Sequence, residues 1–141
     1  MKRYTKIDRK LVHAKFEGRC AYCGCKLENE TGKHMHVDHI EPVYRDMYNK
    51  RIPYRENNNP ENLNPACVRC NLYKSTLSVE HFREWVKNSY HVLEKVTAYN
   101  NAIRFGMLEV KEWDGLFYFE KYCKQDSCID IPQYHSMKIK F

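Results

Sequence analysis

The chain has 141 residues, of which 43% are hydrophobic and 30% charged, with only five glycines and five prolines. This composition indicates one globular domain, or a small module with an extension, and excludes a largely disordered chain. No apolar run approaches the roughly 18 residues that a membrane span needs, and no signal peptide is visible. We therefore expect a cytoplasmic protein without a membrane partner, in which most cysteines stay reduced.

The net charge of +6 belongs entirely to the first half of the sequence. Residues 1–75 carry 15 Lys and Arg against 9 Asp and Glu, whereas residues 76–141 carry 9 of each. The excess positive charge favours an anionic partner for the first half, and nucleic acid is the commonest such partner. An ordinary solvated basic surface is the alternative.

The first predicted element is a helix over residues 8–17. Ile7, Leu11 and Ala14 share one face of it, with Phe16 beside them, and we expect this face to point inward. Gly18 follows directly and is a suitable helix terminator, because glycine adopts the left-handed conformation that commonly ends a helix.

A strand is predicted over residues 34–40, where Pro42 should end or bend it. Residues 41–61 show little apolar periodicity and predict a long loop, which is uncommon in a small domain unless it is functional. A short strand or turn is expected over residues 62–66, followed by a helix that begins at Asn71.

Ser78 is a good N-cap for a further helix. A stripe of apolar residues at helical spacing continues from it, with an expected break near residues 88–89, and Gly106 should end it. The stripe consists of Val79, Phe82, Val86, Leu93, Val96 and Ile103. Asp114-Gly115 lies between two apolar segments, 110–113 and 116–119, and this pattern predicts a β-hairpin with a type I′ turn.

Two Cys-x-x-Cys pairs stand 43 residues apart, Cys20 with Cys23 and Cys67 with Cys70. Four thiolates in two such pairs match the tetrahedral preference of Zn²⁺ and leave no open position, so the site should be structural. Buried free thiols are the alternative. Cys25 could compete as a ligand, but its one-residue spacing from Cys23 is a poorer chelate. We expect Cys123 and Cys128 to be ordinary buried cysteines.

The ordered motifs Cys20-x-x-Cys23, Val37-Asp38-His39-Ile40-x-Pro42, Asn62-Leu63, and Cys67-x-x-Cys70-Asn71 with Lys74 resemble the zinc-containing HNH endonucleases. The resemblance covers about residues 16–86, including Phe82-Arg83-x-Trp85. One departure is that many members carry two glycines after the Asp-His strand, whereas this chain has none there.

The resemblance implies an α+β fold with a ββα-metal core, a structural zinc clamp and an N-terminal helix. We expect residues 1–86 to form this nuclease core. Residues 87–141 would form a C-terminal helical extension with the β-hairpin, packed on the core as one globular unit. The resemblance also implies an intracellular protein of bacterial or phage type.

The resemblance implies that His39 is the general base of a DNA endonuclease and that Asp38 and Asn71 hold Mg²⁺ or Mn²⁺. Asn62 would hold the loop that aims His39. The chemistry suits these residue types, because a neutral imidazole can activate water and a hard divalent ion takes oxygen ligands. The alternative is that Asp38 and His39 are a satisfied polar pair at a strand end.

The expected partner is double-stranded or branched DNA, and the sequence leaves a homodimer open. His34 and His36 alternate with Asp38, so they either assist at the site or are exposed to solvent. The predicted phosphate contacts are Arg45, Lys50, Arg51, Arg55, Arg69 and Lys74. Two other functions fit the sequence: a non-catalytic zinc-stabilised module that binds nucleic acid, and a zinc-stabilised protein-interaction domain.

Overall fold

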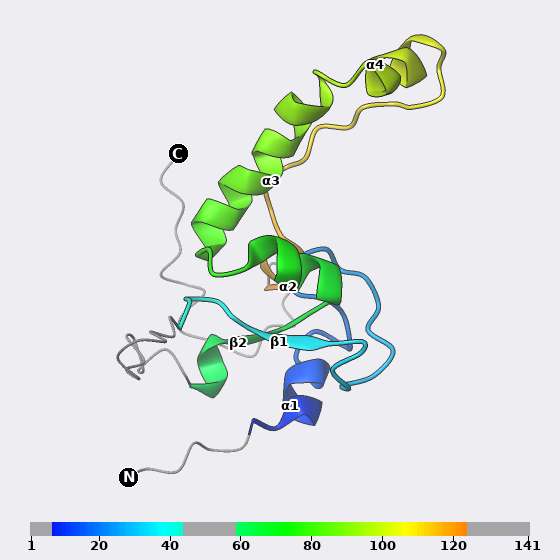
Figure 1. The fold of residues 1–141 in the computed structure, drawn as a ribbon. Helices are drawn as coiled ribbons and strands as arrows, with labels where there is room; N and C mark the ends of the chain where they lie inside the picture. Colours follow the sequence, from blue (N-terminus) through cyan, green and yellow to red (C-terminus); the bar gives the residue numbers. More distant parts are fainter. Residues whose placement is uncertain (1–6, 44–58, 124–141) are drawn as a thin grey trace.

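A computed structural model of the chain describes residues 7–43 and 59–123. Helices surround a small antiparallel sheet, so the predicted α+β class is confirmed (Figure 1). The elements in order are α1 (Arg9–Ala14), β1 (His36–His39), the 3₁₀ helix η2 (Pro60–Asn62), β2 (Leu63–Ala66), α2 (Val68–Lys74), α3 (Val79–Leu93), α4 (Thr97–Arg104) and α5 (Tyr118–Cys123).

Strands β1 and β2 pair antiparallel with His36 opposite Ala66 and His39 opposite Leu63. Helix α2 packs against both strands, and α1 packs against β2. All four residues of β2 are buried, because helices and the first cysteine turn cover this strand. The carbonyl of Pro65 accepts a hydrogen bond of 2.8 Å from the N–H of Ala21, which ties that turn to the sheet.

The first helix is present but its predicted inner face was wrong. Ile7, Leu11 and Ala14 are all exposed, and the buried side chains are Val12 and Phe16. The helix is also shorter than expected, because the chain leaves the helical conformation after Lys15 and turns tightly at residues 17–18. The side chains that reach the core next to β2 are therefore those of Val12 and, just after the helix, Phe16.

The core is built around Tyr22, which lies in the first cysteine turn. Its ring meets Phe82 and Phe117 edge-on, each at a centroid distance of 5.4 Å. Phe82 of α3 in turn stacks on Phe117 at 5.2 Å. One aromatic cluster thus joins three distant segments of the chain, and such pairs add to the area they bury.

Helix α3 begins as predicted, since the hydroxyl of Ser78 accepts a hydrogen bond from the N–H of His81. The helix runs without a break through residues 88–89, and the interruption instead falls at residues 94–96, before α4. Gly106, at φ +72°, ends α4 as expected.

The predicted hairpin at Asp114-Gly115 is absent, and α5 occupies part of the expected second strand. The side chain of Asp114 accepts a 3.0 Å hydrogen bond from the N–H of Leu116, which forms a local turn. The N–H groups of Tyr118 and Phe119 bond to carbonyls of the first cysteine turn instead of to a neighbouring strand. Packing against that turn therefore replaces strand pairing.

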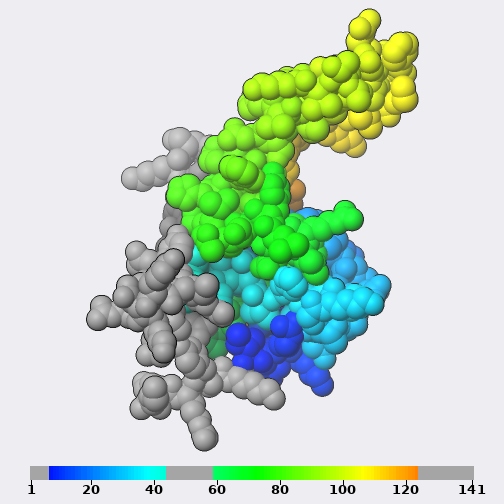
Figure 2. All heavy atoms as spheres, in the orientation of Figure 1, coloured from blue at the N-terminus to red at the C-terminus, as the bar shows by residue number. Residues whose placement is uncertain are grey.

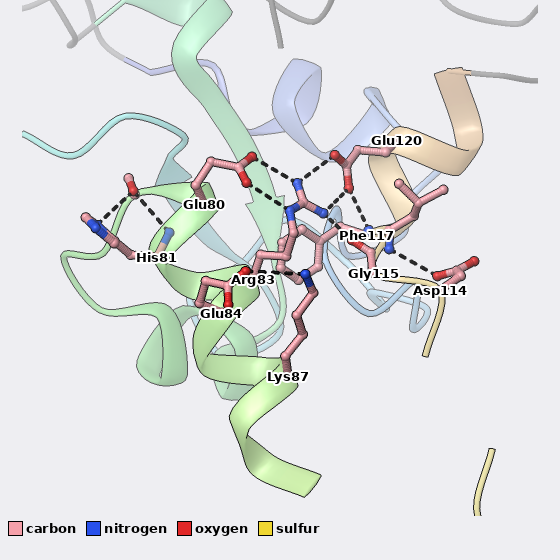
Figure 3. A network of polar contacts seen from close by, with 11 residues as sticks. Glu80, His81, Arg83, Glu84, Lys87, Asp114, Gly115, Phe117 and Glu120 are labelled. Atoms are coloured by element: carbon pink, nitrogen blue, oxygen red, sulfur yellow. Dashed lines mark hydrogen bonds and ion pairs between the residues drawn. The ribbon is translucent and has the colours of Figure 1, made fainter. Parts of the chain in front are cut away.

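Arg83 fastens α3 to this C-terminal segment (Figure 3). Its side chain is 4% exposed. The guanidinium bonds to both carboxylate oxygens of Glu120 at 2.7 and 2.8 Å and also reaches Glu80 and the carbonyl of Gly115. A bidentate pair of this kind fixes geometry as well as charge.

The second half of α3, together with α4 and the chain that returns beside them, projects from the rest of the molecule as an arm (Figures 1 and 2). We call residues 87–112 the arm; none of them is buried. The division into units at residue 86 stays a prediction, and that boundary falls inside α3.

Two further expectations concern membrane spans and a cysteine. No helix in the described part of the chain has the length and apolar character of a membrane span. Cys123 was expected to be an ordinary buried cysteine, but it is half-buried and disulfide-bonded.

Candidate active site and metal cluster

Four cysteine sulfurs gather beside the sheet, from Cys20, Cys23, Cys67 and Cys70, all within 4.8 Å of one another. The Sγ atoms of Cys23 and Cys67 are 3.9 Å apart. Four thiolates around one tetrahedral ion, at the usual Zn–S bond length, would have sulfurs about 3.8 Å apart. The cluster can therefore hold a metal ion with little rearrangement, as the paired spacing predicted.

Local backbone geometry builds each half of this cluster. In the first turn, the N–H of Gly24 bonds to the carbonyl of Cys20 and the N–H of Cys20 to the carbonyl of Cys25, both at 2.9 Å. In the second, Cys67 is the N-cap of α2, so Cys70 lies in the first turn of that helix. The side chain of Cys25 is exposed and lies outside the four-sulfur group.

Asp38 of β1 is buried, with 5% of its surface exposed. The ammonium of Lys74 lies 3.1 Å from one of its carboxylate oxygens, and the hydroxyl of Tyr22 donates a hydrogen bond to the same oxygen. Burial raises the pKa of Asp38, although Lys74 and Tyr22 act in the opposite direction. The carboxylate thus faces α2 and the core, and it already has two partners.

His39 follows at the end of β1 and is half-buried. Its carbonyl accepts a 2.8 Å hydrogen bond from the ammonium of Lys74, and the next N–H, of Ile40, bonds to the carbonyl of Asn62 at 2.9 Å. The backbone on both sides of His39 is therefore fixed. Because side chains alternate along a strand, the imidazole leaves the face of the sheet opposite to Asp38.

Asn62, the last residue of η2, holds the chain just after β1. Its amide oxygen accepts the N–H of Glu41 at 2.9 Å, and its amide nitrogen donates to the carbonyl of the same residue at 2.8 Å. This pair of bonds imitates a strand pairing and fixes the exit of β1, one residue beyond Ile40. Asn62 therefore holds the chain two residues after His39.

Asn71 and Lys74 lie three residues apart on α2, so both face β1. The amide nitrogen of Asn71 lies 2.9 Å from Nδ1 of His36, and Lys74 meets Asp38. The hydrogen bond to His36 uses the amide nitrogen of Asn71 and leaves the amide oxygen, the atom that a metal would bind, outside that contact. Two contacts therefore join β1 to α2 side by side: Asp38 meets Lys74, and His36 meets Asn71.

Lys74, His36 and Tyr22 also contribute to this site, and the sequence indicated them to different degrees. Lys74 was predicted to contact phosphate, but it is 0% exposed and its ammonium is directed to Asp38 and the carbonyl of His39. Its position three residues after Asn71 was the available signal. His36 shares the face of Asp38, as strand alternation indicated, whereas no sequence pattern pointed to Tyr22.

Of the remaining predicted phosphate contacts, only Arg69 lies within the described residues, and it is exposed on α2. The other four, Arg45, Lys50, Arg51 and Arg55, lie outside them. The basic surface that the sequence predicts therefore stays a prediction, except that Arg69 is accessible beside the second cysteine pair.

Comparisons with known proteins identify the central part of the chain. Residues 20–77 match the family model of the HNH endonuclease. YoqL, an SPbeta prophage-derived protein of Bacillus subtilis strain 168 named for the HNH endonucleases, is 28% identical over 112 residues, which are 79% of this chain and 40% of YoqL. The Septu protein PtuB of Bacillus thuringiensis is 40% identical over 58 residues, which are 41% of this chain and 20% of PtuB. The chain thus spans less than half the length of either relative, and no solved structure matches it.

Proposed function

Because residues 20–77 match the family model of the HNH endonuclease, we propose that the protein is a metal-dependent endonuclease that hydrolyses phosphodiester bonds of DNA. The observation that supports this proposal best is the way in which the structure holds the backbone of His39 while its side chain stays accessible. Its backbone is held on one side by Lys74 and on the other through Asn62, while its side chain is half-buried instead of enclosed. A residue held in this way suits a catalytic base, which must be positioned accurately and still reach the substrate.

In the proposed reaction, a neutral His39 takes a proton from a water molecule. The oxygen of that water forms a new bond to phosphorus, and the bond from phosphorus to the 3′ oxygen breaks. The departing 3′ oxygen takes a proton from a second water molecule, which leaves 5′-phosphate and 3′-hydroxyl ends. Asn62 and Lys74 act through the backbone of His39, so we assign them positioning roles.

A divalent ion, Mg²⁺ or Mn²⁺, would be held by Asp38 and Asn71. Their carboxylate and amide oxygens suit a hard cation that keeps most of its water ligands, and such an ion stabilises the charge that grows on the phosphate. Asp38 lies on β1 and Asn71 on the facing helix α2, and each takes part in one of the two adjacent contacts that join these elements. Asp38 must share its carboxylate with Lys74 for this role, since the two already form a close ion pair.

We assign the four-cysteine cluster to a structural Zn²⁺ ion. The sulfur donors are soft, their number fills a tetrahedral ion, and Cys70 is followed directly by Asn71, so the ion would fix the position of a catalytic ligand.

A plasmid-nicking assay tests the proposal. Wild-type protein with supercoiled plasmid and Mg²⁺ or Mn²⁺ should give nicked or linear DNA, and excess chelator should abolish the reaction. His39→Ala should lose on the order of 10²–10⁴-fold in rate. His34→Ala is the matched control, because His34 lies before β1 and pairs with Glu28 on the surface. Normal cleavage by His39→Ala would remove His39 from the mechanism.

A second function is favoured by one observation, the existing partners of Asp38 and Asn71. Residues that are already satisfied suit a zinc-stabilised module that binds nucleic acid without cutting it. Such a protein would bind DNA with a steep dependence on salt concentration but leave plasmid intact with every divalent ion tested.

A further inference from the structure

The outer part of the arm exposes an unusual number of large apolar side chains. We call residues 90–110 the arm tip; it contains the end of α3, the whole of α4 and the first residues of the returning chain. Eight of its large hydrophobic residues are exposed by 41–75%, namely Tyr90, Val92, Leu93, Val96, Phe105, Met107, Leu108 and Val110. Single exposed hydrophobic residues are ordinary, but a group of this size on one projection is typical of an interaction surface.

Local hydrogen bonds hold the parts of the arm tip together. The side chain of Asn100 donates a 2.8 Å hydrogen bond to the carbonyl of Glu94, which packs the start of α4 against the end of α3. The N–H of Met107 bonds to the carbonyl of Ala102 at 2.8 Å, which caps the C-terminal end of α4 and fixes Phe105 and Met107 to it. The exposed side chains therefore belong to one structural unit.

The arm tip lacks a core that would stabilise it. Helix α4 has eight residues and no buried residue, and helices shorter than about 12 residues are marginal in water unless they pack against something. Among the described residues, no other element covers it, and Figure 2 shows it standing clear of the body of the molecule. A packing partner would supply the missing stabilisation.

The net charge of the arm tip indicates which kind of partner it would bind. Within the arm tip, Lys95 and Arg104 balance Glu94 and Glu109, so the unit is neutral. Phosphates or anionic lipids would not be attracted to it, in contrast to the first half of the chain. Two copies of a neutral apolar surface can meet without electrostatic repulsion, and symmetric dimers are the commonest assemblies of this kind.

The exposed area is sufficient for a modest dimer. The eight side chains present on the order of 500 Å² of apolar surface, and with the polar atoms around them they approach the roughly 800 Å² per partner of a standard interface. We propose that the arm tip is a dimerisation surface whose occupant is the arm tip of a second copy of this chain. The cysteine cluster and His39 belong to β1, α2 and the first cysteine turn in the body of the molecule, from which α4 stands clear (Figure 1), so this contact leaves them accessible.

Sedimentation equilibrium of the full chain tests the proposal over roughly 1–100 μM. We expect a mass that rises with concentration toward twice the chain's 17.0 kDa. The double variant Phe105→Glu with Met107→Glu should weaken the association at least tenfold, because each dimer would then bury four carboxylates in an apolar contact. Leu11→Glu is the matched control, since Leu11 on α1 is 71% exposed, as Met107 is 70% exposed.

Hydrogen exchange provides a second measurement that does not depend on a variant folding correctly. The amides of α4 should be protected more at high protein concentration than at low, while those of β1 and β2 should not change. A chain that is monomeric throughout this range, or an association that the two arm substitutions leave unaltered, overturns the proposal. Neither result bears on nuclease activity, so the two proposals fail separately.

Discussion

The ion pair between Lys74 and Asp38 offers a sharp test of how the site is held. The two side chains are 1% and 6% exposed and their charged atoms are 3.1 Å apart. Lys74→Met keeps most of the side-chain volume but removes the charge, which leaves the carboxylate of Asp38 buried beside Tyr22 alone. Breaking a buried pair by removing one partner costs about 3–5 kcal/mol. We expect a loss of stability in that range, unless Asp38 takes up a proton and limits it.

Urea unfolding in the presence of excess Zn²⁺, followed by circular dichroism, measures this loss. Lys87→Met is the matched control, because Lys87 and Glu84 form an exposed pair at 3.3 Å, and exposed pairs contribute less than about 1 kcal/mol. If the two variants lose the same small amount of stability, the buried pair does not have the importance that we assign to it.

A double substitution separates the missing charge from a packing defect. Asp38→Asn added to Lys74→Met removes the uncompensated carboxylate and keeps its shape, so it should recover a large part of the loss. Residues in direct contact usually show such coupling, whereas independent sites add. Additive losses would mean that Lys74→Met acts through packing alone.

The remaining predictions concern the metal cluster and three contacts of the core. Cys67→Ser should lose bound zinc and cooperative unfolding together, as measured by metal analysis and circular dichroism, whereas Cys25→Ser should retain both, because the side chain of Cys25 lies outside the sulfur group. Burial lowers the pKa of Lys15 to about 8, with the charge of Glu61 opposing. The unfolded chain therefore binds more protons between pH 8 and 10.5, so stability should rise with pH across this window, and Lys15→Met should abolish the rise. Gly24→Ala should cost about 1–3 kcal/mol in a urea titration, because φ is +75° and the new Cβ would lie 2.7 Å from the ring of Tyr118. Arg83→Met should destabilise the protein and, in hydrogen exchange, should selectively expose α5, since Glu120 would lose its bidentate partner.

The cysteine cluster and the central strands could be predicted because their signals are local. A Cys-x-x-Cys pair places two sulfurs on one turn whatever the rest of the chain does, and alternation in residues 36–39 defines the faces of a strand. Ser78 as N-cap and Gly106 as terminator followed from side-chain chemistry in the same way. The match to the HNH endonuclease family model, residues 20–77, falls within the stretch that the resemblance covered.

The failures came from tertiary contacts that no local pattern records. Asp114-Gly115 has the sequence of a hairpin turn, but the residues that should form the second strand bond to the first cysteine turn. The face of α1 was misassigned because the helix ends early, at Ala14, and the chain then turns at residues 17–18. The pairing of Asp38 with Lys74 could not be foreseen either, since it depends on how α2 lies across β1.

Helix α2 joins the two proposed metal sites. Its N-cap Cys67 and first-turn Cys70 belong to the sulfur cluster, Asn71 follows at once, and Lys74 at the end of the helix holds Asp38 and the backbone of His39. Cys67, Cys70, Asn71 and Lys74 thus lie within eight consecutive positions of one helix and its N-cap. Loss of the structural ion would therefore disturb the base and both proposed ligands together. Substitution of Lys74, at the far end of α2, leaves the four sulfurs unchanged, so a stable Lys74 variant should retain its zinc and lose cleavage.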